Sequence, residues 1–246
     1  MKKLLVCGYV LAICVAAGCK KDYQNSKIYL LKQQITDDRE DGLPLDTATY
    51  NYDDHYRVIT ITDGTAPNRI TFTLDYDSQN RVTSGKRYGN NGNLQIQYDF
   101  FYRGDTTGYI FHGGSLADTA YFTFNSQSQV TQITSKHSGY ETFEYDTRGN
   151  VSATQGYKND GSFNLNDQGG YTYDNMKNPF SQTAHKNLFL EYIVFVDNPS
   201  TLINNIADKN GEPFTYAYNK DGFPVSATIL TYTNTTIKVY YNYILK

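Results

Sequence analysis

The chain has 246 residues, including 24 Tyr and 13 Phe, and its formal net charge is −3. A weakly acidic chain lacks the basic surface with which proteins neutralise phosphates, so we expect no nucleic-acid partner. Abundant Tyr, Phe and Thr with only 2 Met favour strands over helices, and no long i, i+3, i+4 apolar pattern occurs. The composition therefore predicts an all-β protein.

The N-terminus has the pattern of an export signal. Lys2 and Lys3 precede an apolar run over residues 4–17, which is too short for a bilayer-spanning helix of about 20 residues. The small residues just before Cys19 resemble the lipobox of bacterial lipoproteins. This resemblance implies cleavage before Cys19 and acylation of that residue, with an ordinary signal peptide as the alternative.

Removal of this signal changes both the thiols and the charge of the mature chain. Cys7 and Cys14 are lost with it, so Cys19 is the one cysteine left and we expect no internal disulfide, thiol catalysis or thiolate metal site. Twenty basic residues then remain against 25 acidic ones, a formal charge of −5. Because no Pro-, Gly- or Ser-rich linker follows, we assign residues 1–18 to a lipoprotein signal peptide, 19–26 to the lipidated cysteine and a short tether, and 27–246 to a single β domain.

A motif of an aromatic strand followed by a tight turn recurs along this domain. The sequence FEYDTRGNV begins at Phe143, and the variants YNYDDHYRV, LDYDSQNRV, FTFNSQSQV, YTYDNMKNP and YAYNKDGFP begin at Tyr50, Leu74, Phe122, Tyr171 and Tyr216. The aromatics before the turn are 24, 48, 21, 28 and 45 residues apart, so we place degenerate copies near Tyr102 and Phe195 and a last strand at Tyr243. Roughly 24 residues hold two strands and two turns, which makes the unit a β-hairpin.

The residues of the motif suit a structural role. Phe143 and Tyr145 lie on one face of a strand, Asp146 is placed to accept the backbone hydrogen bond that starts the turn, and Gly149 to take a positive φ. The equivalent turn-forming residues are Asp53, Asp77, Asn125, Asp174 and Asn219. Asn keeps the acceptor oxygen of Asp but loses the charge. The position therefore needs turn geometry rather than a carboxylate, which argues against catalysis or metal binding there.

Eight or nine such hairpins predict 16 to 18 antiparallel strands, whereas open twisted sheets rarely exceed about 10. We therefore expect an all-β fold, a large antiparallel meander of repeated β-hairpins that is strongly curled or barrel-like. Bilayer-spanning strands need about 9 to 11 residues with an unbroken apolar row. Segments such as YFTFNSQSQV reach turn residues too early, so the expected body is a lipid-anchored soluble domain rather than a spanning barrel.

The motif resembles the YD repeats of Rhs-type bacterial proteins, and FEYDTRGNV is the closest match. Together with the lipobox and the segment YTYDNMKNPF, it makes the chain similar to a family of uncharacterised Bacteroidota lipoproteins whose domain is described as porin-like in fold. The resemblance implies a porin-like fold and an envelope location. It provides no activity or site residue to transfer to this chain.

Candidate residues for chemistry are scattered. His55, His112, His137 and His185 lie in no HxH, HExxH or GxSxG motif. The segments DDREDG at 37–42 and DKNGE at 208–212 offer oxygen ligands for Ca²⁺ but lack the spacing of a twelve-residue calcium loop, and the second suits a hairpin turn. The RGD triplet at 103–105 also coincides with an expected turn. We predict no catalytic residue, no metal and no cofactor.

Two DTA triplets, at 46–48 and 118–120, resemble the acceptor motif for O-glycosylation in Bacteroidota and would suit exposed turns. The predicted function is a non-enzymatic binding or scaffold module, held at the outer membrane by acyl chains on Cys19 and facing the periplasm or the cell surface. A glycan or an outer-membrane protein is the expected partner, because Tyr rings stack on sugars, although most Tyr here occupy inward positions that predict core packing. A hydrolase of envelope polymers and a purely structural coat component are the alternatives.

Overall fold

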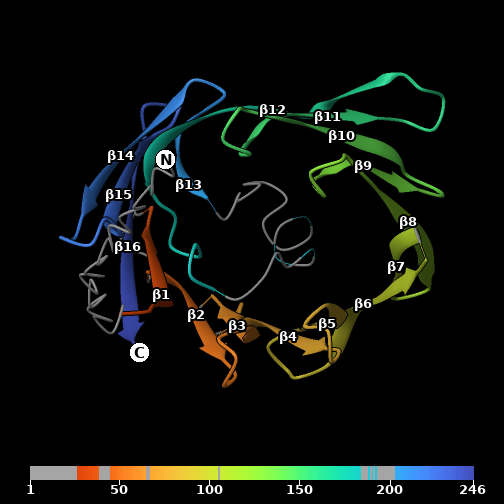
Figure 1. The fold of residues 1–246 in the computed structure, drawn as a ribbon, viewed down its shortest axis with the longest axis horizontal. Helices are drawn as coiled ribbons and strands as arrows, with labels where there is room; N and C mark the ends of the chain where they lie inside the picture. Colours follow the sequence, from red (N-terminus) through yellow and green to blue (C-terminus); the bar gives the residue numbers. More distant parts are fainter. Residues whose placement is uncertain are drawn as a thin grey trace, which may run out of the picture.

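The computed structural model describes residues 27–38, 45–64, 67–104, 106–183 and 203–246, together with Leu188, Leu190 and Tyr192; for 165–167 it describes the backbone alone. These residues form 16 strands that close into one antiparallel barrel. Figure 1 shows the barrel as a complete ring viewed down its axis. The prediction of an all-β, barrel-like meander of hairpins is confirmed.

Each strand pairs with its neighbours in sequence, and the ring closes where β1 pairs with β16, from Tyr29 opposite Leu245 to Asp37 opposite Lys238. The strands are β1 Tyr29–Asp37, β2 Asp46–Tyr52, β3 Val58–Asp63, β4 Ile70–Tyr76, β5 Val82–Tyr88, β6 Leu94–Arg103, β7 Thr106–Gly113, β8 Leu116–Phe124, β9 Val130–Ser135, β10 Gly139–Tyr145, β11 Val151–Tyr157, β12 Phe163–Lys177, β13 Asn204–Lys209, β14 Glu212–Tyr218, β15 Pro224–Leu230 and β16 Thr236–Leu245. The copy expected near Tyr102 ends β6, and the one expected near Phe195 lies outside the described residues.

Alternation along the strands directs apolar side chains to the inner face of the barrel. In β4, Phe72, Leu74 and Tyr76 belong to the core, so Thr71 and Asp75 point outward. Around the ring, the buried side chains Leu31, Tyr50, Val58, Ile61, Val82, Phe100, Phe122, Val130, Phe143, Val151 and Tyr171 line the interior. The interior is therefore apolar, whereas the interior of a bilayer-spanning barrel is polar.

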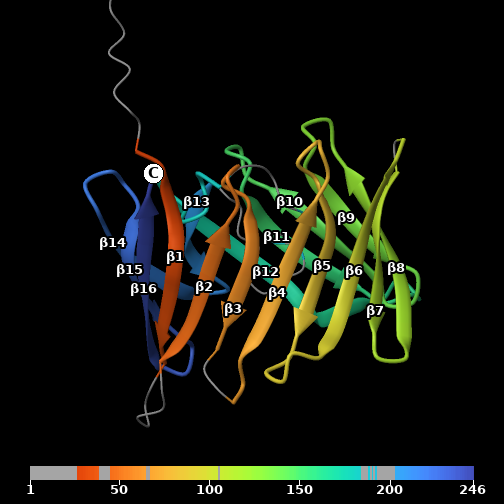
Figure 2. The same cartoon turned by 90° about the horizontal axis from the view of Figure 1, so that it is seen from below.

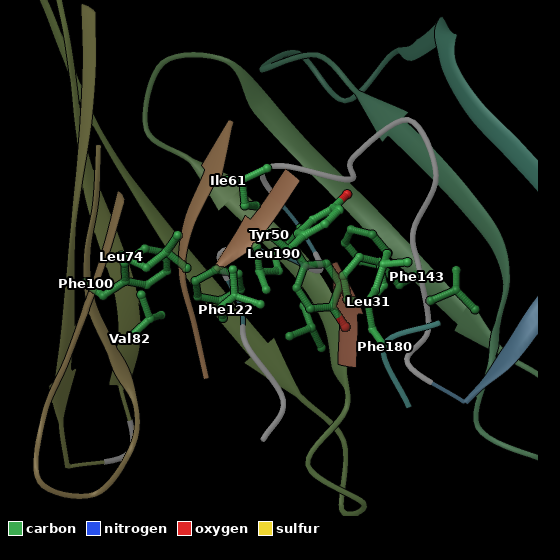
Figure 3. Close-up of a cluster of buried hydrophobic side chains, with 14 of the residues drawn as sticks. Leu31, Tyr50, Ile61, Leu74, Val82, Phe100, Phe122, Phe143, Phe180 and Leu190 are labelled. Atoms are coloured by element: carbon green, nitrogen blue, oxygen red, sulfur yellow. The ribbon is translucent and has the colours of Figure 1, made fainter. Parts of the chain in front are cut away.

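The chain after β12 contributes to the filling of the barrel. It turns from the wall into the ring, where Phe180 is buried, and Leu190 and Tyr192 are buried in the same cluster (Figures 1 and 3). Phe180 packs edge-on against Tyr50 with the ring centroids 5.2 Å apart, and Tyr192 packs in the same way against Phe143 at 5.1 Å. Aromatic contacts of this geometry add to the free energy of burial, so the interior is a packed core where these residues lie.

The two ends of the barrel carry different turns. The motif turns that follow β2, β4, β8, β10 and β14 share one end with the start of β1 and the end of β16, and we call it the motif end. Ile28 and Lys246 exchange two backbone hydrogen bonds of 3.0 Å there. In Figure 2 the C-terminus and the arrowheads of β2 and β4 lie together at this end. The opposite, distal end carries the turns after β5, β11, β13 and β15.

Candidate functional site

A groove on the outer face of β10, β11 and β12 begins at an irregularity in strand pairing. Gln155 of β11 pairs with Gln168, whereas the next residue, Gly156, pairs with Asn164. Residues 165–167 of β12 therefore have no partner on β11 and form a bulge. Such bulges bend the strand that contains them, and this one lies in the distal part of β12.

The groove has a volume of about 800 Å³. Phe143 and Tyr145 point into the barrel, so their neighbours Thr142 and Glu144 face the groove from β10. The other outward-facing lining residues are Ala153, Gln155 and Tyr157 of β11, Phe163, Gln168 and Gly170 of β12, and Asn210 of the β13–β14 turn. A hollow of this size is within the range of ligand sites in proteins.

A row of three aromatic rings crosses the outer face at the distal end. Tyr140 stacks on Tyr157, its partner across β10 and β11, with the centroids 4.5 Å apart and the planes at 12°. Tyr157 then contacts its partner Phe163 at 5.1 Å and 34°. Phe163 ends the row and is 61% exposed. An apolar ring held at a fixed orientation is thus presented to solvent at the edge of the groove.

The floor of the groove has little side-chain bulk. Ala153 lies opposite Gly170, and a Cβ atom built on Gly170 would meet only the Oδ1 atom of Asn210, at 3.7 Å. Two hydrogen bonds to Gly170 fix Asn210. The Asn210 Oδ1 accepts the Gly170 N–H at 2.6 Å, and the backbone N–H of Asn210 donates to the Gly170 carbonyl at 2.9 Å. A ligand could therefore lie flat against this backbone.

The lining combines one exposed aromatic face with several groups that form hydrogen bonds in both directions. Gln155 and Gln168 carry amides, Thr142 a hydroxyl, and Glu144 is the one carboxylate among the lining side chains that the structure describes. Amides and hydroxyls match the alternating donors and acceptors of a sugar, and the ring of Phe163 matches its apolar C–H face. The groove therefore places several hydrogen-bonding groups beside one exposed aromatic ring.

The predicted turn residues lie at the motif end of the barrel, just beyond the part of the groove that Glu144 and Ala153 line. Asp146 Oδ1 accepts the backbone N–H groups of Arg148 at 2.9 Å and Asn150 at 2.8 Å. The same pair of bonds, to residues two and four positions on, recurs at Asp53, Asp77, Asn125 and Asn219. Gly149 has a φ of 90°.

Asp174 departs from this pattern. Its Oδ1 accepts the N–H of Met176 at 2.9 Å and that of Asn205 at 3.2 Å, and its Oδ2 accepts the hydroxyl of Tyr218.

The regular motif turns hold their carboxylates in the charged form, as Asp53 shows. Partial burial by itself raises the pKa of Asp53, but hydrogen bonds from the Arg57 side chain and from nearby backbone N–H groups outweigh it and lower that pKa. Hydrogen bonds of this kind stabilise a turn.

The remaining sequence candidates do not converge. His112 lies 3.5 Å from Asp99 on the outer face, His55 and His137 are in turns, and Cys19 and His185 lie outside the described residues. Among the residues that can be described, no three His, Cys, Asp or Glu side chains are grouped to hold a metal ion. No helix within the same ranges is long and apolar enough to cross a membrane.

The short motifs fall partly on strands. The DTA triplets lie in β2 and β8, so the expectation of exposed turns is wrong, and Ala120 of the second is only 2% exposed because it faces the packed interior. Asn210 and Gly211 of DKNGE form the β13–β14 turn with positive φ angles of 55° and 87°. Arg103 of the RGD triplet ends β6, and Asp105 lies outside the described residues.

Sequence reasoning missed the groove residues. A signal was present, because Tyr140 is out of phase with Phe143 and Tyr145 in β10 and therefore points to the opposite face. Tyr157 and Phe163 flank the turn sequence KNDGS, outside the motif that drew attention. The bulge in β12, which makes the hollow, has no comparable sequence signal.

Comparison with known proteins supports the fold. No protein-family model matches the chain, and no curated protein matches its sequence. Among solved structures, a porin-like protein from Bacteroides uniformis is similar, with 17% identity, a TM-score of 0.56 and coverage of 89% of this chain and 97% of that one. The TcdB2-TccC3-TEV structure aligns with 79% of this chain and 10% of that chain at 12% identity, with a TM-score of only 0.21. The chain thus has the fold of a porin-like β-barrel.

Proposed function

We propose that the protein is a non-enzymatic, lipid-anchored module of the bacterial cell envelope that binds a carbohydrate in the groove over β10–β12. The observation that carries the proposal is the exposed ring of Phe163 beside the amides of Gln155 and Gln168. A porin-like neighbour is compatible with an envelope location. The apolar, packed interior favours a body that lies beside the membrane over one that spans it, because spanning barrels have a polar interior.

The position of Lys27 supports an orientation of the barrel. Lys27, the first described residue, lies at the motif end, whereas Tyr157, Phe163 and Asn210 lie toward the distal end. Acylation of Cys19 leaves residues 19–26 as a tether, and eight extended residues span at most about 29 Å. The motif end then faces the bilayer, and the aromatic part of the groove, at Tyr157 and Phe163, is directed away from it.

Binding rather than hydrolysis is favoured by the acids of the groove. Glycoside hydrolysis requires a pair of carboxyl groups on either side of the scissile bond. Glu144 is the one carboxylate that the described lining residues supply. The groove therefore has groups suited to hold and orient a sugar, and we assign it a binding role.

The test is binding of the full mature lipoprotein to an array of neutral and acidic oligosaccharides, followed by calorimetry with the best ligand. Phe163→Ala should weaken that affinity about fivefold, since aromatic contacts of this kind contribute about 1 kcal/mol. Gly170→Leu should abolish binding because it fills the floor, and the nearest atom leaves room for the new side chain. Tyr232→Ala, which removes an aromatic ring that is 86% exposed in another turn, is the matched control.

Equal affinity of the native protein, Phe163→Ala and Gly170→Leu would refute the groove as the site. The anchor has its own test, in which Cys19→Ala should move the protein from the membrane to the soluble fraction. Protease treatment of intact cells with an epitope-tagged copy then distinguishes the two faces of the outer membrane. Loss of the tag places the groove at the cell surface, and protection places it in the periplasm.

A further inference from the structure

A second hollow, of about 150 Å³, lies inside the barrel and is separate from the groove. The wall is formed by the inner faces of β13–β16 and β1, and the opposite side by the segment after β12 that turns into the ring. Its apolar lining includes Phe180, Ile206, Phe214, Ile229 and Val239. The groove is on the outer face of other strands, so the two hollows share no lining residue.

Two polar side chains of this lining lie side by side on neighbouring strands. Gln34 of β1 pairs in register with Tyr241 of β16, and both line the cavity. Within the described ranges, neither the Gln34 amide nor the Tyr241 hydroxyl has a hydrogen-bond partner. The nearby Tyr216 differs, because its hydroxyl donates to the carbonyl of Ile206 at 2.9 Å. Polar groups left without partners in a cavity are available to a ligand.

The lining also sets the charge and size of that ligand. The described lining residues carry no charged side chain, so an ion would lose its hydration without compensation. Burial raises the pKa of Tyr241, so this hydroxyl stays protonated and can donate. A protein cavity of about this volume holds one benzene ring. We propose that the interior cavity binds a small neutral molecule with a single ring and a hydroxyl or carbonyl group, its ring against Phe180 and Val239 and its polar group on Gln34 and Tyr241.

Phenol is the first probe, titrated by calorimetry into the full mature protein in detergent and followed by saturation-transfer NMR. We expect saturable binding with a dissociation constant on the order of 1 mM or tighter, which is reasonable for seven non-hydrogen atoms. Benzene, which lacks the hydroxyl, should bind about fivefold more weakly, and benzoate, which carries a charge, should not bind. Absence of saturable phenol binding by the native protein would overturn the proposal.

Variants locate the site. Val239→Phe fills the cavity and should abolish phenol binding, whereas Val225→Phe on the exposed face of β15 serves as its control for folding and for uptake by detergent. Gln34→Leu keeps the volume of the cavity but removes the amide, and it should erase most of the preference for phenol over benzene even if Val239→Phe fails to fold. Phenol affinity that is unchanged in both cavity variants would overturn the proposal. Phe163→Ala should leave phenol binding intact, which separates this site from the groove.

Discussion

The hydroxyl of Tyr76, at the end of β4, donates a 2.6 Å hydrogen bond to the carbonyl of Val58, the first residue of β3. The ladder between these strands runs from Thr60 to Asp63 and stops short of Val58, so the phenol takes the place of a backbone donor. The same bond joins Tyr52 to Leu31, Tyr102 to Val82, Tyr145 to Val130, Tyr173 to Val151 and Tyr243 to Pro224. This bond explains why the recurring aromatic is nearly always Tyr.

Replacement of Tyr76 by Phe should destabilise the barrel. The ring remains in the core, but the Val58 carbonyl loses its donor, and an unsatisfied buried polar group costs about 1–3 kcal/mol. Urea unfolding of Tyr76→Phe should show a lower midpoint with an unchanged slope. The exposed Tyr232→Phe should change the midpoint by less than a fifth as much, and equal shifts for the two variants would contradict the role given to the bond.

The first residue of each motif turn should tolerate loss of charge but not loss of its oxygen. Asp77 Oδ1 accepts two backbone N–H groups, from Gln79 and Arg81, at 2.9 Å each, and Asn125 makes the same pair of bonds without a charge. We expect Asp77→Ala to lower the free energy of unfolding by about 1–2 kcal/mol and Asp77→Asn by less than half of that. Chemical denaturation measures both, and equal losses would show that the charge matters more than the geometry.

Acid should weaken the same turns. Partial burial raises the pKa values of Asp53, Asp77 and Asp146, but hydrogen bonds from the side chain and backbone four residues on outweigh it, and each pKa is lowered. A carboxyl whose folded pKa lies below its unfolded value of about 3.9 stabilises the fold above that pH, and the contribution is lost as pH falls further. A variant with Asn at all three positions, Asp53, Asp77 and Asp146, should therefore lose less free energy of unfolding than the native protein between about pH 5 and about pH 3. If stability fell with pH equally steeply in the variant and in the native protein, the acid sensitivity could not be assigned to these three carboxylates.

Arg57 connects adjacent repeats and should not be replaceable by Lys. Its Nε atom donates to Asp53 Oδ2 at 2.6 Å, an Nη1 hydrogen goes to Asn80 of the next turn at 2.8 Å, and the guanidinium lies 4.5 Å from the centroid of the Tyr76 ring. Lys lacks the planar fork that makes these contacts together, so Arg57→Lys should cost about 1 kcal/mol. Arg81 is placed similarly, but its side chain is 46% exposed, against 15% for Arg57, and Arg81→Lys should cost less. Thermal unfolding measures both losses, and the melting temperature should fall further in Arg57→Lys than in Arg81→Lys.

Two glycines with positive φ should differ sharply in their tolerance of Ala. A Cβ atom on Gly139 would lie 2.0 Å from the carbonyl oxygen of Tyr157, whereas one on Gly161 would meet nothing within 4 Å. Both substitutions carry the cost of a left-handed backbone, about 1 kcal/mol, but Gly139→Ala must also displace a neighbouring strand. We expect Gly161→Ala to fold with a slightly lower melting temperature and Gly139→Ala to lose more than about 3 kcal/mol or fail to fold. Circular dichroism melts test this difference.

Local features of the sequence determined the class of fold and the strand count. The alternation of Phe143 and Tyr145, the turn chemistry of Asp146 and Gly149 and the spacing of the motifs depend on neighbouring residues and on the two-residue period of a strand. The tertiary structure alone decided how the sheet closes, because Tyr29 and Leu245 are paired across the whole chain.

Both candidate sites likewise depend on contacts between residues distant in sequence. The groove arises where β12 slips against β11 and where the pairing of β12 with β13 places Asn210 beside Gly170. The cavity arises where β1 meets β16 and Gln34 pairs with Tyr241. The sequence pattern of one strand predicts which of its side chains share a face. It does not predict which strand will pair with it or where the register between the two will shift. Register and closure are set by the packing of the whole ring, and for that reason the local motifs predicted the wall of this barrel but not its hollows.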